Sequence, residues 1–336
     1  MLNWLRRACM TACALVLAAC GSRATGDVDQ IVVGADPAAW EQVEQLLRRE
    51  LEPTPFALPG ERAFELTHAD PTASSWEEAR LGRQVLLIGT AENPWIAEAL
   101  ERWRGAPPQV PSRTEVADVW ANGQHALVLL LPAEMPEAAL RQEMVDLKNT
   151  YVQRYREYVV ERMYFPEGPD QALADTIRSS AGFELRVPQS YAWSRQRDVL
   201  RFGPAAVPEG APSLNVTVTW QAPIPPGARS EPLALLGWRE QVAAEHYAGP
   251  QFVEPTAVRG GPTTHRGSLA LQLVGTWTAP GSSRRGPFIL RTVMCPIQDR
   301  MYLLDGWLDP AGQEGHEHMV EIESVINSFR CGSAGR

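Results

Sequence analysis

The sequence predicts an α+β protein built from two α/β domains, the second of which is an antiparallel sheet packed with helices. Three observations predict this class. Strand and helix patterns alternate in the first half, long hairpin-spaced strands dominate the second, and a segment rich in proline and glycine separates them. With 336 residues, 44% of them hydrophobic and 21% charged, the chain is long enough for two packed cores. We expect an N-terminal α/β domain at residues 30–165 and a C-terminal α+β domain at residues 175–331.

The start of the chain predicts a lipoprotein leader. Two arginines precede an apolar run over residues 8–19, which is shorter than the roughly 20 residues that a membrane-spanning helix needs. The run ends in the sequence LAAC, the pattern of a bacterial lipobox, in which the thiol of Cys20 accepts a diacylglycerol. We therefore expect a signal peptide at residues 1–19, lipid attachment at Cys20 and a flexible, lipidated tether at residues 20–29. The alternative is an ordinary cleavable signal with an accidental cysteine.

A lipid anchor on Cys20 predicts both a location and a class of partner. We expect the protein in the bacterial cell envelope, held in the outer membrane with its body in the periplasm, because Gly21 and Ser22 do not force retention in the inner membrane. The formal net charge of −9 disfavours nucleic acid and anionic lipid surfaces as electrostatic partners. The expected partners are the membrane, through the anchor, and an envelope protein, while the ligand is unknown.

Cysteine usage predicts one disulfide. Cys9 and Cys13 leave with the leader and Cys20 takes the lipid, so that Cys295 and Cys331 remain in an oxidising compartment. A bridge between these two would tie a strand to the end of the last helix and contribute about 3–4 kcal/mol in the loop-closure model. Two unrelated buried cysteines are the alternative.

Strand–helix units form the first half of the chain. A strand at residues 30–33 precedes Asp36 and Pro37, which are typical of a helix N-cap and first turn. The apolar face of that helix comprises Trp40, Val43, Leu47 and Leu51. The pattern recurs with a strand at residues 85–88 and Asn93 as the cap. The buried face of the second helix comprises Trp95, Leu100 and Trp103.

A hairpin and a long helix complete the first half. The dipeptide Asn122-Gly123 between two apolar segments indicates the hairpin. The long helix is expected from Pro136 to Tyr164, and the segment at residues 165–169, with sequence FPEGP, ends it and marks the domain boundary. One side of this helix carries a stripe typical of a core-facing helix, formed by Leu140, Met144, Leu147, Tyr151, Tyr155 and Val159.

The second half is rich in strands. Its expected strands lie at residues 183–187, 199–202, 214–220, 269–277, 288–294 and 301–307. Helices are expected at residues 233–247 and 317–329. Long strands with short connections and few helices favour an antiparallel sheet on which the helices pack.

His316-Glu317-His318 is the nearest approach to a metal-binding cluster. Histidines two positions apart on a helix point about 200° apart, so they do not form the pair that an i, i+4 spacing provides. We interpret the motif as a solvated helix start, and we expect no metal and no cofactor.

Asp305 and Asp309, on either side of Trp307, are the candidates for paired catalytic carboxylates. Because Asp305-Gly306 and Asp309-Pro310 are also typical turn dipeptides, we interpret them as turns.

Two other side-chain sets bear on function. His68 and Asp70 could serve a hydrolase, although a nucleophile elbow of the G-x-S-x-G type is absent from the sequence. Trp193 and Trp307 are candidates for a sugar-binding platform. We expect no catalytic residue and favour a protein that is not an enzyme.

Several segments together resemble the domain-of-unknown-function 4837 family of bacterial lipoproteins. The resemblance rests on IVVGADPAAW, FELTHADP, VADVWANGQHALVLLL, the tyrosine-bearing helix and the ending RMYLLDGW…IESVINSF. It covers nearly the whole mature chain and implies an envelope lipoprotein without assigned catalytic residues. The order of elements in the second half, ending in Ser328-Phe329, also resembles PsbP-like domains, which are mostly accessory or assembly factors. That resemblance implies a binding role and names no ligand.

Three classes of function remain open. An accessory or assembly protein that acts through protein contacts predicts an apolar patch. A small-molecule or glycan-binding lipoprotein predicts a pocket with a few convergent polar groups. An envelope hydrolase predicts a cleft with titratable groups of perturbed pKa. We favour the first class because the sequence contains no catalytic motif, and the binding class is the main alternative.

Overall fold

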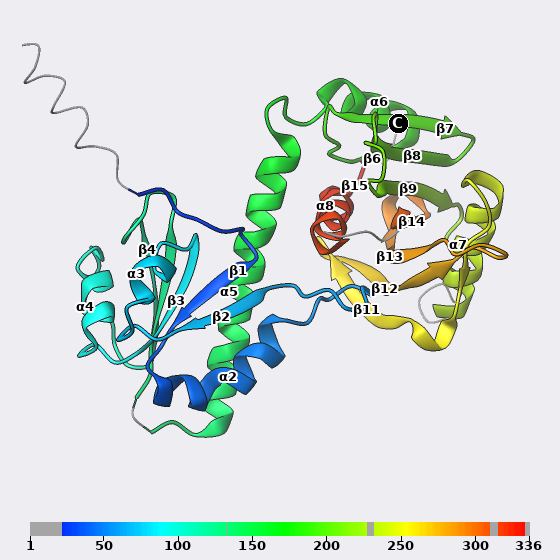
Figure 1. Cartoon of the computed structure of the whole chain (residues 1–336). Helices are drawn as coiled ribbons and strands as arrows, with labels where there is room; N and C mark the ends of the chain where they lie inside the picture. The colour runs from blue at the N-terminus through cyan, green and yellow to red at the C-terminus, as the bar shows by residue number, and fades with distance from the viewer. Residues whose placement is uncertain (1–21, 133, 227–231, 310–314, 333–336) are drawn as a thin grey trace, which may run out of the picture. The chain divides into compact units, whose positions relative to one another are not determined.

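The computed structural model describes residues 22–132, 134–226, 232–309 and 315–332 (Figure 1). Its helices and sheets confirm the α+β class. By its internal contacts the chain divides into two compact units. The N-terminal unit comprises Met1–Pro53 and Arg62–Tyr155, and the C-terminal unit comprises Thr54–Glu61 and Arg156–Arg336.

This division differs in two ways from the domain boundary that the sequence predicts. It falls after Tyr155, within the long helix, and not in the segment at residues 165–169. It also assigns Thr54–Glu61 to the C-terminal unit, so the chain passes between the units three times. Phe56 of that segment is buried with its ring 5.8 Å from that of His316, and Thr54 lies 3.0 Å from the same histidine, which accounts for the membership of the segment in the C-terminal unit.

A five-stranded sheet lies at the centre of the N-terminal unit (Figure 1). In chain order its strands are β1 (Gln30–Gly34), β2 (Glu65–Ala69), β3 (Gln84–Gly89), β4 (Ser112–Ala117) and β5 (His125–Leu130). They follow the spatial order β2-β1-β3-β5-β4, and β4 runs antiparallel to β5 while the other pairs are parallel. Every residue of β3 and β5 is buried, as expected of parallel strands that are covered on both faces.

The helices that accompany this sheet begin largely as the sequence predicts. They are α2 (Pro37–Leu51), α3 (Trp76–Ala79), α4 (Pro94–Leu100) and α5 (Glu137–Tyr164), the last of which continues into the C-terminal unit. The Asp36 carboxylate accepts a hydrogen bond from the backbone N–H of Ala39 at 2.9 Å, which caps α2. Every member of the predicted stripe on α5 is buried. The predicted buried position of Trp103 is wrong, because α4 ends at Leu100 and Trp103 is 39% exposed.

An eight-stranded sheet of antiparallel pairs lies at the centre of the C-terminal unit, in the order β10-β12-β13-β14-β9-β8-β7 with β11 also paired to β12 (Figure 1). The long strands are β9 (Ser213–Gln221), β12 (Ser268–Thr278), β13 (Arg285–Cys295) and β14 (Arg300–Asp309). The shorter ones are β7 (Tyr191–Gln196), β8 (Val199–Pro204), β10 (Phe252–Val253) and β11 (Arg259–His265). A separate pair joins β6 (Phe183–Glu184) to β15 (Arg330–Cys331).

Two helices pack on opposite faces of the large sheet. The helices of this unit are α6 (Gln171–Ala181), α7 (Pro232–His246) and α8 (Gly315–Ser328). Trp307 of β14 shares a core cluster with Leu235 of α7. Its neighbour Gly306 faces α8, where an added Cβ would lie 2.1 Å from Ile322. Successive side chains of a strand point to opposite faces, so α7 and α8 enclose the sheet between them.

Asp305 and Gly306 lie inside β14, so the turn predicted from this dipeptide is wrong. Gly306 is required because α8 packs directly against its backbone. Asp305 points to the other face, where it pairs with Arg239 of α7. Tertiary contacts therefore override the local turn preference of the dipeptide.

The start of α8 is covered by the Thr54–Glu61 segment, so the solvated helix start predicted from His316-Glu317-His318 is wrong. His316 is 8% exposed, and its Nδ1 lies 3.0 Å from Oγ1 of Thr54. The His316 backbone N–H donates to Oε2 of Glu61 at 2.8 Å, which places a carboxylate at the N-terminus of the helix. The pKa of His316 is lowered to about 4, mainly by burial, so this side chain is neutral at pH 7.

Candidate functional site

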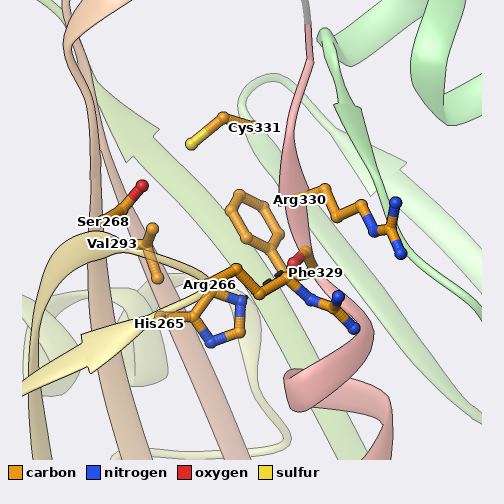
Figure 2. A pocket seen from close by; sticks show the side chains of 7 residues that line it. All are labelled: His265, Arg266, Ser268, Val293, Phe329, Arg330 and Cys331. Atoms are coloured by element: carbon orange, nitrogen blue, oxygen red, sulfur yellow. Dashed lines mark hydrogen bonds between the residues drawn. The ribbon is translucent and has the colours of Figure 1, made fainter.

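A pocket of about 330 Å³ opens beside the end of α8 in the C-terminal unit (Figure 2). It is lined by His265, Arg266, Ser268, Val293, Phe329, Arg330 and Cys331. These residues come from the β11–β12 turn, from β13 and from the chain segment that follows α8. Three segments that are far apart in the sequence therefore line the same pocket. We call this site the basic pocket.

The basic pocket is formed by a tight turn and by residues 329–331, which follow α8 and are called the chain end below. Arg266 and Gly267 join β11 to β12, and His265 pairs with Ser268 in the ladder. Both turn residues have left-handed φ angles, 48° and 81°, as expected of a two-residue hairpin turn. Figure 2 shows the guanidinium groups of Arg266 and Arg330 extending to the same side of the chain end, with Ser268 on the other side.

His265 has a structural role in the pocket. It is 6% exposed, and its Nε2 lies 2.8 Å from the backbone oxygen of Phe329, which can only accept, so Nε2 carries the proton. Its Nδ1 then accepts from Nη1 of Arg291 at 3.1 Å. Burial is the main cause that lowers the pKa of His265, and the charge of Arg291 lowers it further. Both ring nitrogens are thus occupied, and the neutral ring fixes the position of the chain end.

Arg291 of β13 organises the polar network behind the pocket. It is 6% exposed, and it donates to Oε1 of Gln272 at 2.9 Å and to Oδ1 of Asn327 at 2.6 Å. Its guanidinium also lies 3.9 Å from the Glu323 carboxylate, which pairs with Arg156 at 2.6 Å. These bonds tie β11, β12 and β13 to the last turn of α8, and they make the frame rigid.

The basic pocket is positively charged. Two of its seven lining residues are arginines, both exposed, and none of the seven carries a carboxylate. The nearby Glu184, which pairs in register with Arg330 through the backbone, directs its carboxylate to Arg178 at 3.2 Å. The positive charge is therefore local, since the chain as a whole has a formal net charge of −9.

A disulfide holds the pocket wall that contains Cys331. It joins Cys331 to Cys295, 36 residues earlier, with a Cα–Cα distance of 5.7 Å. The bond attaches β15 to the end of β13, and so fixes the segment that carries Arg330. Cys20, the expected lipid attachment site, lies outside the described residues.

The structure does not bring Asp305 and Asp309 together as catalytic carboxylates. Four residues apart on one strand, they are separated by roughly 13 Å, beyond the about 5–9.5 Å of glycosidase pairs. Asp305 is 1% exposed and pairs with Arg239, while Asp309 pairs with Arg284.

The other candidates have local structural roles. Nε2 of His68 lies 2.9 Å from the backbone oxygen of Ala35, and its ring stacks on Trp40 with centroids 4.6 Å apart. The Asp70 carboxylate accepts from the backbone N–H of Thr72 at 2.9 Å.

The two tryptophans proposed as sugar platforms differ in exposure. Trp307 is 2% exposed, so it cannot offer a ring face to a ligand in solution. Trp193 is 42% exposed on β7 and remains available. Within the described ranges, no three histidine, cysteine, aspartate or glutamate side chains are grouped as a metal site would require.

The sequence did not indicate the basic pocket, although Val293 lies in a predicted strand, Phe329 at the end of a predicted helix and Cys331 in the predicted disulfide. Its arginines fall in no motif, and His265, Arg266 and Arg330 belong to segments for which the sequence analysis predicts no strand. One local signal was present, because Arg266-Gly267 lies between two strands at the spacing of a two-residue turn.

No family model matches this chain, and no curated protein matches it. Among solved structures, it is similar to the Ran-binding protein Mog1p of Saccharomyces cerevisiae at 8% identity, over 45% of this chain and 91% of that chain, with a TM-score of 0.32. It is also similar to LpqN of Mycobacterium tuberculosis, described as involved in cell envelope biogenesis, at 18% identity over 45% of this chain and 83% of that chain, with a TM-score of 0.28.

Proposed function

We propose that this protein is a lipid-anchored accessory protein of the bacterial cell envelope that acts by binding an anionic ligand in the basic pocket. The observation that carries the proposal is the pair of exposed arginines, Arg266 and Arg330, on a rigid frame in an otherwise acidic chain. A pocket with a few convergent polar groups is what the binding class of function predicts. The leader and Cys20 support the anchored location.

The chemistry of the pocket favours binding over hydrolysis. Ser268 is the lining residue with a hydroxyl group, and His265 is the nearest candidate for a base. Both nitrogens of His265 are already engaged, one with Arg291 and the other with the backbone oxygen of Phe329. No proton acceptor is therefore free on this ring to activate the serine.

A second candidate function is an assembly factor that acts through protein contacts. It is favoured by β7, which is the last strand in the order of the large sheet. Every residue of β7 after Tyr191 is exposed, including Trp193. An exposed edge strand can accept a strand from a partner protein through backbone hydrogen bonds.

Replacing Cys20 tests the anchor. We expect Cys20→Ser to move most of the protein from the membrane pellet to the soluble periplasmic fraction, because a thioether to lipid is no longer possible. In the described part of the chain, no helix has the length and apolar character to cross a membrane. Fractionation followed by immunoblotting measures the change. A variant that stays in the pellet after a high-salt wash would contradict the anchored location.

Replacing Arg330 tests the binding site. Native mass spectrometry of the full chain, purified from cells in mild detergent, is expected to show an anionic small-molecule adduct. Arg330→Glu should reduce its occupancy at least about tenfold, because a charge-assisted hydrogen bond becomes a repulsion. Arg285→Glu is the matched control, since Arg285 is exposed at the other end of β13. Equal occupancy in the two variants would count against the pocket.

A further inference from the structure

The two exposed arginines of the basic pocket have unused donors. Arg266 donates from Nε to the backbone oxygen of Asn327 at 3.2 Å, and no described residue accepts from its two Nη groups. The guanidinium of Arg330 forms no hydrogen bond or ion pair with any side chain in the described ranges. Both groups extend to the same side of the chain end (Figure 2). Both residues line the pocket and carry like charges with unused donors, which a nearby anion would stabilise.

The charge behind the opening has the same sign. Arg291 and Arg156 both approach the single carboxylate of Glu323, at 3.9 Å and 2.6 Å. The other acceptors of Arg291 are the neutral groups of Gln272, Asn327 and His265. The network formed by Arg291, Arg156 and Glu323 therefore contains two positive charges and one negative charge, although the Arg156 side chain is 42% exposed.

We infer that the basic pocket binds a phosphate group carried on a small organic molecule, an inference that rests on the proposed function. A guanidinium pairs with phosphate or carboxylate oxygens through two parallel N–H···O hydrogen bonds. One guanidinium is enough to pair with both oxygens of a carboxylate. A phosphate presents enough oxygens to pair with two guanidinium groups, and both Arg266 and Arg330 line the pocket.

The rest of the pocket accommodates the organic part of the ligand. A volume of about 330 Å³ lies within the range of small-molecule sites and exceeds what a bare ion fills. The remaining wall includes Ser268, Val293 and Cys331, which offer one hydroxyl and an apolar surface. The phosphate can belong to a soluble ester or to a phospholipid headgroup, since both present the same chemistry.

Isothermal titration calorimetry of the full, lipidated chain in a non-ionic detergent separates these sources. The ligands are glycerol 3-phosphate for a soluble ester, dihexanoyl phosphatidylglycerol for a headgroup, and acetate as the carboxylate comparison. At least one phosphate compound is expected to bind, at least about tenfold more tightly than acetate, and the tighter one identifies the source. The inference is overturned if neither phosphate compound binds, or if acetate binds as tightly.

Glutamine variants locate the site. Arg330→Gln breaks no side-chain hydrogen bond or ion pair within the described ranges, so we expect the fold to be preserved. It should weaken phosphate binding at least about tenfold, as should Arg266→Gln. Arg285→Gln makes the same charge change outside the pocket and should stay within about twofold of the unmodified chain. Equal weakening by all three variants would assign the effect to net charge and overturn the inference. An adduct that depends on Arg330 but contains no phosphorus would overturn the phosphate assignment and leave the proposed function standing.

Discussion

Asp305→Ala is expected to destabilise the C-terminal unit by about 3–5 kcal/mol, because it leaves a buried guanidinium without its counter-charge. Arg239 is 0% exposed and Asp305 is 1% exposed, and Arg239 Nε donates to Asp305 Oδ1 at 2.9 Å. Tyr247 donates its hydroxyl to Oδ2 of the same carboxylate at 2.7 Å. Arg239 also donates to Oε1 of Gln251 at 2.6 Å, a neutral acceptor that cannot replace the lost charge.

The matched control for this prediction lies on the same strand. Asp309 pairs with Arg284, whose side chain is 43% exposed. Exposed ion pairs contribute about 0–1 kcal/mol, so Asp309→Ala should cost no more than that. Urea-dependent hydrogen exchange, read by mass spectrometry on peptides from β14, measures the free energy of unfolding for this unit. If the Asp305 and Asp309 variants lose equal stability, the buried pair does not have the role assigned to it.

Removing the disulfide is the second change with a large expected effect. Reduction, or the double variant Cys295→Ser with Cys331→Ser, should lower the stability of the C-terminal unit by about 3–4 kcal/mol, because the 36-residue separation sets the loop entropy that the bond removes from the unfolded chain. Since the bond attaches β15 to β13, exchange should rise first in the peptide that contains Arg330.

The same exchange experiment with and without dithiothreitol measures this effect. The Cys295→Ser, Cys331→Ser double variant serves as the control, because dithiothreitol should leave it unchanged. An unmodified chain whose exchange at β15 does not respond to dithiothreitol would show that the bond does not stabilise the pocket wall.

Apolar periodicity accounts for most of the fold that the sequence predicts. The long helix α5 is confirmed to within a residue because six apolar side chains repeat along one face. The long strands β12, β13 and β14 are confirmed for a similar reason, since runs of apolar residues form the centre of the large sheet. Regular burial leaves a pattern in the sequence wherever a whole face is covered.

Elements without such a pattern were missed. β11 has the sequence RGGPTTH and lies mostly exposed on the outside of β12, so it carries almost no apolar signal. The helix α6 also went unpredicted, although its ends carry usable signals. Asp170 caps its start, and Gly182, with a φ of 77°, ends it. More weight on capping residues would have located this helix.

The basic pocket could not have been predicted from sequence spacing. Its lining residues come from three regions, around positions 265–268, 293 and 329–331, and strand register brings them together. Its disulfide is the exception, because two cysteines in the expected oxidising compartment predict their own pairing. The positive charge of the pocket depends on which arginines the fold leaves without an acidic partner, and the composition of the chain does not reveal which arginines these are.

The most direct test of the basic pocket is nitrogen-15 NMR of the arginine Nε–Hε groups in the full chain, during titration with the phosphate compound that binds more tightly. Direct contact should shift the Arg266 and Arg330 signals in a saturable manner, while the Arg285 signal stays in place. Shifts of all three signals in proportion, or of none at saturating ligand, would contradict the account, because they would mean that the anion does not bind between the two pocket arginines.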